Sequence, residues 1–221
     1  MFTHNVAITF QNISLMEDIQ ATSRELVYLL AGAVEARSRE TGAHVKRVSI
    51  ISERLAQLAG LSDIETELIK LASPLHDVGK VAIPDAILHK SGSLDAAEWE
   101  IMKRHVEHGV QILSGSQRAI IRKGAEIAAH HHERWDGAGY PNGLVGEQIP
   151  ISGRITALAD VFDALGSRRS YKQAYPEEQV IEVIRNERGR HFDPVLTDLL
   201  LHNASEFLAI RRQFPDDEHD G

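Results

Sequence analysis

The chain has 221 residues, a formal charge of −8, and 43% hydrophobic and 25% charged side chains, values typical of one soluble globular domain. It contains no cysteine. This excludes disulfides, thiolate zinc sites and iron–sulfur clusters, and leaves only nitrogen and oxygen ligands for a metal. A chain this acidic has no global field for holding a nucleic-acid backbone, so DNA is not an expected partner.

The N-terminus lacks the basic region that opens a signal peptide. The longest apolar run covers residues 26–34, contains Tyr28 and is far too short to span a bilayer. We therefore expect a cytoplasmic protein that does not act at a membrane.

Helical periodicity dominates the first half of the chain. One long or slightly broken helix is predicted from about residue 21 to residue 58. Its core candidates recur at spacings of three and four residues: Leu26, Leu30, Ala33, Val48, Ile51, Leu55 and Leu58. Gly60 stops this helix, and Ser62 with Glu65 forms a capping box for the next one, which runs towards Asp77. Gly79 and Pro84 then open a loop that extends to residue 92.

The second half also reads as helices, separated by one long loop. Asp95 and Glu98 begin the first of them, and Asp193-Pro194 begins the last. The loop from residue 136 to residue 151 is rich in Gly and Pro and has no helical period. The predicted helices cover residues 95–113, 116–131, 154–165 and 176–189, and continue from residue 193. Alternating strands and internal repeats are absent from the sequence, which predicts an all-α, single-domain fold.

Residues of metal-ligand type occur as four separated units, each within a predicted helix. The units are His44, the pair His76-Asp77, the pair His131-His132, and Asp160, with Glu40 and His105 as further candidates between or beside them. Separate helices can aim such side chains at one point. Neutral imidazoles and carboxylates suit divalent iron or manganese, and a shared carboxylate allows two or more ions to lie side by side.

Each unit also has a simpler interpretation. Glu40 and His44 lie one helical turn apart on an otherwise apolar face, where an unpaired carboxylate is costly and a cation is expected. A buried pair between Glu40 and Arg37, beside a core histidine, would also explain them. Consecutive helical residues point about 100° apart, so His130 is expected on the solvent side or behind the ligands.

The acids of the predicted helix 154–165 can divide their roles. Asp160 and Asp163 are three residues apart and face one side of the helix. One would be a metal ligand, and the other would orient a lysine or a water.

Taken together, these residues resemble the HD-GYP family, a branch of the HD-domain metal-dependent phosphohydrolases. The resemblance covers about residues 25–205. It runs through Glu40-Thr41-Gly42-Ala43-His44, His76-Asp77-Val78-Gly79-Lys80, His105, the stretch 131–141 with its Gly139-Tyr140-Pro141, Asp160-Val161-Phe162-Asp163-Ala164-Leu165, Arg169-Ser170-Tyr171-Lys172 and His191-Phe192-Asp193-Pro194.

The resemblance implies an HD-type helical bundle with a GYP loop, formed by residues 25–205. Residues 1–24 would be an extension or linker stub, and residues 206–221 a helix end with an acidic tail. The implied activity is hydrolysis of cyclic di-GMP to pGpG, and often to GMP. Family members usually join this domain to a receiver or sensor domain, for which residues 1–24 are too short.

The resemblance also implies a set of two or three divalent ions, with iron or manganese expected before zinc. The implied ligands are Glu40, His44, His76, Asp77, His105, His131, His132 and Asp160. Asp77 would bridge two ions, and Glu40 matches the position that equips some members with a third ion. A hydroxide between the ions would attack phosphorus in line with the leaving 3′ oxygen.

Substrate contacts are implied outside the metal ligands. Lys80 would reach the phosphate or pair with Asp163, and Arg169 and Lys172 match positions that bind guanine or phosphate. Tyr140 would either contact the ligand or shape the pocket floor. Two residues depart from the family pattern: Ser38 replaces a common acid, and Ser170 replaces a usual proline.

Other functions remain open at this point. One is hydrolysis of 3′,3′-cGAMP, and another is a slow-turnover receptor that signals through a regulatory protein or a diguanylate cyclase. A general nucleotide hydrolase of the HD type would lack the Gly139-Tyr140-Pro141 loop. The amphipathic N-terminal helix could support a homodimer, although the core could use the same apolar stripe.

Overall fold

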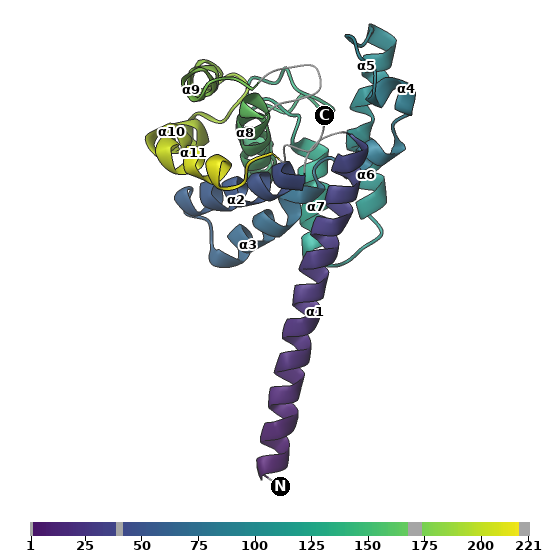
Figure 1. The fold of residues 1–221 in the computed structure, drawn as a ribbon, viewed down its shortest axis with the longest axis vertical. Helices are drawn as coiled ribbons and strands as arrows, with labels where there is room; N and C mark the ends of the chain where they lie inside the picture. Colours follow the sequence, from purple (N-terminus) through teal and green to yellow (C-terminus); the bar gives the residue numbers. More distant parts are fainter. Residues whose placement is uncertain (1, 39–41, 168–173, 217–221) are drawn as a thin grey trace.

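The computed structural model describes residues 2–38, 42–167 and 174–216, and Figure 1 shows their arrangement. Within these ranges the chain is helical, with two isolated bridges and no β-strand, which confirms the all-α prediction. The elements are α1 (Phe2–Arg37), α2 (Gly42–Leu58), α3 (Asp63–Ala72), η1 (Ser73–Leu75), η2 (Val78–Ala82), α4 (Asp85–Leu88), α5 (Ala96–Lys103), α6 (His105–Leu113), α7 (Ala119–His130), η3 (Gly146–Gln148), α8 (Ile151–Gly166), α9 (Glu177–Asn186), α10 (Pro194–His202) and α11 (Ala204–Gln213).

The N-terminal helix differs from the prediction in length and in the face that it buries. It begins at Phe2 rather than near residue 21, ends at Arg37, and projects far beyond the other helices (Figure 1). The expected core residues Leu26, Leu30 and Ala33 are exposed. The domain instead buries the face formed by Val27, Ala31 and Val34. One residue along a helix is a rotation of about 100°, so the expected stripe was displaced to a neighbouring face.

The main core joins α2 to the C-terminal half of the chain. Val48, Ile51 and Leu55 are fully buried, as predicted, and pack against α3, α8, α9, α10 and α11. Phe162 of α8 meets Phe207 of α11 edge to face, with ring centroids 6.2 Å apart. A second cluster joins α1 to η1, η2, α6 and α7.

Helix starts follow the predicted caps. The side chain of Ser62 accepts a hydrogen bond from the Glu65 amide, and Asp95 with Glu98 completes a reciprocal capping box. The helix expected from residue 193 divides at Asn203 into α10 and α11. The expected domain boundaries near residues 24 and 206 fall inside α1 and α11. No helix within the described ranges is long and apolar enough to cross a membrane.

The segment after α3 is a pair of short 3-10 turns rather than a continued helix and a loop. Arg37 at the end of α1 holds the second turn, because its guanidinium donates to the carbonyls of Lys80, Val81 and Ile83 at 2.7–2.8 Å. Gly79 lies against α6 so closely that a Cβ there would be 1.9 Å from the His105 carbonyl oxygen. Close packing of η2 on α6 therefore brings Asp77 and His105 together.

We expect Gly79→Ala to lower the free energy of unfolding by about 3 kcal/mol, the upper part of the range for overpacking, because the clashing atoms belong to the backbone. Gly115→Ala is the matched control, since a Cβ there meets nothing within 4 Å, and its effect should stay within about 0.5 kcal/mol. Urea unfolding of both variants measures the difference. Equal stability of the two variants would contradict the packing argument.

Candidate metal centre

The predicted ligand units converge although they are far apart in the chain. His44 comes from α2, His76 and Asp77 from the junction of η1 and η2, His105 from the start of α6, and Asp160 from α8. His131 and His132 follow the last residue of α7. Glu40 lies outside the described residues, and so do Arg169 and Lys172.

One group consists of Asp77, His105, His131 and His132, whose ligand atoms all lie within 4.8 Å of one another. Asp77 Oδ1 is 3.3 Å from His105 Nε2 and 3.6 Å from His131 Nε2. His132 Nε2 lies 3.1 Å from His105 Nε2. Three imidazoles and a carboxylate around one point form a donor set that suits a divalent transition metal.

A second group lies beside the first and shares its carboxylate. Glu35, His44 and His76 offer ligand atoms within 4.8 Å of one another. His76 Nε2 is 3.3 Å from Asp77 Oδ2 and 3.9 Å from Asp160 Oδ1. Because Asp77 Oδ1 faces the first group and Oδ2 faces the second, its carboxylate lies between two potential ion positions.

Buried polar atoms support the fit to cations. Among the described residues, His76 Nε2, His131 Nε2 and Asp77 Oδ1 are inaccessible to solvent and have no hydrogen-bond partner. Burial of such atoms without a partner is costly. Three of them aimed at one region fit positions that are satisfied by metal ligation.

Backbone carbonyls orient the imidazoles. His76 Nδ1 lies 2.8 Å from the Ser73 carbonyl oxygen, His105 Nδ1 lies 2.7 Å from that of Met102, and His131 Nδ1 lies 3.0 Å from that of Ala128. A carbonyl only accepts, so Nδ1 carries a proton in each ring, and Nε2 is the nitrogen that points into the centre. The ends of short helical segments thus set both the tautomer and the direction of the ligands.

His44 is held by a carboxylate instead of a carbonyl. Its Nδ1 is 2.8 Å from Oδ2 of the fully buried Asp163, and its Nε2 is 3.5 Å from Asp160 Oδ1. Arg47 donates to Asp163 from Nε at 2.6 Å and from Nη2 at 2.9 Å. Burial opposes ionisation, but the hydrogen bonds from His44 and Arg47 outweigh it and lower the pKa of Asp163.

The lysine expected beside Asp163 lies elsewhere. Lys80 Nζ is 2.7 Å from Asp77 Oδ2. Asp163 pairs with Arg47, which the sequence did not single out. Arg47 lies three residues after His44, but only the packing of α2 on α8 brings it to Asp163.

The electrostatics differ between the two groups. Burial, reinforced by the neighbouring His131, lowers the pKa of His105 to about 4, and burial also lowers the pKa of His132. These imidazoles are neutral at pH 7 and ready to ligate. Burial disfavours a charge on His76, but Asp77, Asp160 and Glu35 outweigh it and raise its pKa to about 10. The second group is therefore a strongly negative environment that attracts a cation.

Glu35 is a member of this site that the sequence prediction missed. It is buried, lies near the end of α1 and faces His44 and His76. Val27, Ala31 and Glu35 are four residues apart, so the buried face of α1 leads directly to it. Had that face been identified, the carboxylate would have stood out as an acid on an apolar stripe.

The GYP loop borders the first group with aromatic side chains. The Tyr140 ring stacks on His132 with centroids 4.7 Å apart, and Trp99 of α5 meets Tyr140 edge to face at 6.2 Å. Trp99 is 45% exposed, and Lys103 Nζ lies 5.8 Å from the Tyr140 ring centroid. No motif in the sequence marks Trp99 or Lys103, because α5 reaches the loop only in three dimensions.

A buried glutamate shapes the same loop. Glu133 accepts hydrogen bonds from the amides of Asn142 at 2.8 Å and Leu144 at 3.0 Å. The Tyr140 amide donates to the His132 carbonyl at 3.1 Å, and the Tyr140–Pro141 peptide bond is cis. The three hydrogen bonds join the loop to His132 and Glu133, just after α7, and so hold Tyr140 over His132.

Comparison with known proteins identifies the family. The model of a family described as "HD domain" matches residues 29–196. The chain belongs to the HD domain family. The expectation of an HD-GYP domain, drawn from the motifs, is confirmed.

Curated relatives of this HD domain carry the names of cyclic-dinucleotide phosphodiesterases. The 3′3′-cGAMP-specific phosphodiesterase 2 of Vibrio cholerae is 61% identical over 98% of this chain and 41% of its own length. The cyclic di-GMP phosphodiesterase response regulator RpfG of Xanthomonas campestris is 46% identical over 91% of this chain and 53% of its own length. The chain spans about half the length of the curated relatives that it matches.

A solved structure shows the same fold. The cyclic GMP-AMP-specific phosphodiesterase V-cGAP3 of V. cholerae aligns with a TM-score of 0.65 and 20% identity over 84% of this chain and 50% of that chain. At this identity the likeness concerns the fold alone.

We expect Asp163→Asn to lower the free energy of unfolding by about 3 kcal/mol, the lower end of the range for breaking a buried ion pair, because Arg47 keeps Asp216 as a second partner. Glu177→Gln is the matched control: it removes a carboxylate from the exposed Arg212 pair and should change the stability much less, because solvent screens an exposed ion pair. Denaturant unfolding compares the two, and equal losses would refute a supporting role for Asp163.

Proposed function

We propose that this chain is a metal-dependent phosphodiesterase that opens a 3′–5′ phosphodiester bond of a cyclic dinucleotide. The observation that carries the proposal is Asp77, whose two carboxylate oxygens face separate groups of histidines. Adjacent divalent ions bridged by a carboxylate are a recurrent arrangement for in-line displacement at phosphorus. The names of the curated relatives support the same class of substrate.

Each group of residues would hold one ion. The first ion would bind His105, His131, His132 and Asp77, and the second would bind His44, His76, Asp160 and Asp77, with Glu35 beside it. Glu40 remains the proposed ligand of a third ion. Iron and manganese suit these nitrogen and oxygen donors. When bound, the ions supply Lewis-acid activation of water and of the phosphoryl oxygens.

The remaining side chains would position the ligands and the substrate. Lys80, beside Asp77, would supply a positive charge near the phosphate that is attacked. Asp163 would act as a positioning residue, because it orients the His44 ring from behind. We retain Arg169 and Lys172 as proposed contacts to guanine or phosphate.

Aromatic side chains at the edge of the centre would bind a purine base. Tyr140 and Trp99 lie edge to face beside His132, and about half of Trp99 is exposed. Stacking of a base on an aromatic side chain is tolerant of the base's identity. Lys103 adds a positive charge beside the Tyr140 ring, where a phosphate would be attracted.

Cyclic di-GMP is the proposed substrate, with pGpG or GMP as product. A second candidate, 3′,3′-cGAMP, is favoured by the 61% identity to a relative named as specific for it. The two ligands differ in one purine, so the choice concerns base contacts and not the metal centre. Either substrate would place the enzyme in the cytoplasm of a bacterium, where regulatory proteins or cyclases for these messengers would be its partners.

The first prediction of this proposal concerns turnover. Protein reconstituted anaerobically with ferrous iron or manganese should hydrolyse cyclic di-GMP, with 3′,3′-cGAMP tested in parallel and the products separated by chromatography. Asp77→Ala should lower kcat/KM by more than the roughly 10–100-fold typical for loss of an outer partner of a ligand. Chelation of the metal should have the same effect.

Glu107→Ala is the control, because Glu107 is exposed on α6 near His105 and contacts only Arg104 at 3.9 Å among the described partners. It should keep its activity. Absence of turnover with a full complement of bound metal would refute the phosphodiesterase. The ratio of kcat/KM for the two substrates decides between them.

The second prediction concerns the aromatic edge. Trp99→Ala should raise KM about 5- to 150-fold, which corresponds to about 1–3 kcal/mol of base stacking, with kcat and metal content nearly unchanged. Ile101→Ala, at an exposed residue of the same helix, is the matched control. If both variants give the same KM as the unmodified protein, Trp99 does not contact the substrate.

A further inference from the structure

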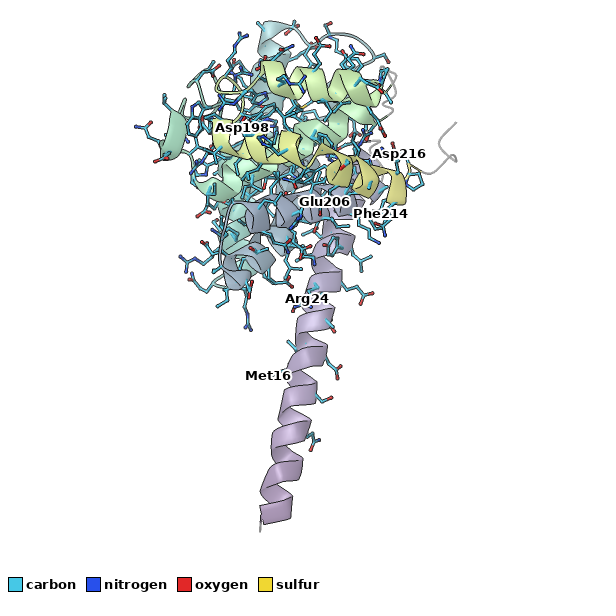
Figure 2. All side chains as sticks on the ribbon, turned by 90° about the vertical axis from the view of Figure 1, so that its left-hand side faces the viewer. Met16, Arg24, Asp198, Glu206, Phe214 and Asp216 are labelled. Carbon is cyan, nitrogen blue, oxygen red and sulfur yellow. The ribbon has the colours of Figure 1, made fainter. Side chains whose placement is uncertain are left out.

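Helix α1 carries two apolar faces, and the domain uses only one of them. Val27, Ala31 and Val34 are buried against the body of the molecule. On the other side, large apolar residues remain exposed along the helix. Their exposed fractions are 56% for Leu15, 69% for Met16, 56% for Ile19, 59% for Leu26, 61% for Leu29 and 44% for Leu30. Figure 2 shows Met16 on a stretch of α1 that stands clear of the other helices.

The exposed face has the spacing of a coiled-coil seam. Its members alternate in steps of four and three residues and are Leu15, Ile19, Thr22, Leu26, Leu29 and Ala33. Such a repeat keeps one stripe facing a partner helix over its whole length. From Leu15 to Ala33 the seam extends about 27 Å along the helix. A scattered exposed leucine needs no explanation, but a continuous seam of this length does.

A groove continues the seam onto the globular part. It has a volume of about 870 Å³ and lies between α1, α3 and α7. Leu26 and Leu30 line one wall, and Ile64, Leu68 and Ile120 line the others. Ile64 is 75% exposed. A helix laid along the seam would therefore also cover the apolar wall of α3 and α7.

We propose that a second copy of this chain is the partner, and that its α1 packs in parallel along the seam and into the groove. A copy of α1 presents the same seam residues at the same heights, so the two stripes are complementary to each other. A dimer formed in this way would have a two-fold axis along the seam, with both globular parts at the same end.

The charges beside the seam determine the parallel orientation. With Ile19 and Leu26 at heptad position a, the g positions hold Asp18 and Glu25, and the e positions hold Met16, Ser23 and Leu30. In a parallel pair each g residue faces an e residue of the partner, so both acids meet uncharged side chains. In an antiparallel pair g faces g, and the acids of one helix would oppose those of the other.

The oligomeric state of the full chain tests the proposal. Light scattering after size exclusion should give the mass of a dimer, and Leu26→Glu combined with Leu29→Glu should give a monomer that is still helical by circular dichroism and still unfolds cooperatively. Val195→Glu is the matched control, since Val195 is 63% exposed on α10, and it should remain dimeric. A monomeric unmodified chain overturns the proposal and leaves the groove to a different partner. A dimer that survives the double substitution overturns it as well.

Disulfide formation tests the orientation. The chain has no cysteine, so Thr22→Cys and Leu29→Cys each introduce a single thiol on the seam. Both variants should form an intermolecular disulfide under mild oxidation in a parallel pair, whereas the exposed Ala21→Cys, outside the seam, should not. Cross-linking of only one seam variant would indicate an antiparallel pair and refute the proposed orientation.

Discussion

The carboxylate of Asp77 lies between two groups of imidazoles, and its burial is unfavourable unless positive charge surrounds it. Lys80 contacts one of its oxygens, and His105 and His131 approach the other. Asp77 also lies between η1 and η2, so the backbone conformation at this junction determines where the carboxylate is placed in the centre. The helices of the domain pack so that ligands from α2, α6, α7 and α8 reach this carboxylate.

Helix ends do much of the positioning. His76, His105 and His131 all lie at the beginning or end of a helical segment, and the Nδ1 atom of each contacts a carbonyl three residues earlier in the chain. Carbonyls near a helix end retain accepting capacity, and a carbonyl oxygen has two lone pairs, so it can accept an imidazole N–H beside a backbone amide. The arrangement satisfies the helix ends and aims Nε2 inward at the same time. His44 lies inside the chain's second helix and needs Asp163 and Arg47 for the same purpose.

Helix α1 connects the periphery to the centre. Its exposed seam begins at Leu15, its buried face packs on the core, and its last turn carries Glu35 and Arg37. Glu35 faces His44 and His76, and Arg37 holds the carbonyls of η2. The position of α1 therefore affects the ligands in two ways: through Glu35, beside His44 and His76, and through Arg37, which holds the η2 turn.

The helical class, most helix starts and most of the residues that meet at the centre could be predicted from the sequence alone. Those features depend on local chemistry. Caps such as Asp95 with Glu98, and starts such as Asp193-Pro194, are visible over a few residues, and so are the short motifs that contain the histidines and acids. The family followed from the same motifs, and the comparison with known proteins confirms it.

The buried face of α1, the carboxylate that Lys80 contacts and the aromatic residues beside the centre depend on how the helices pack. Two apolar stripes on one helix are equally periodic, and only the packing of α1 on α2, η1 and η2 selects Val27 over Leu26. Glu35 became visible as a site residue for the same reason. Arg47 and Trp99 act through contacts with residues more than 40 positions away, and separations of that length leave no periodic signal in the chain.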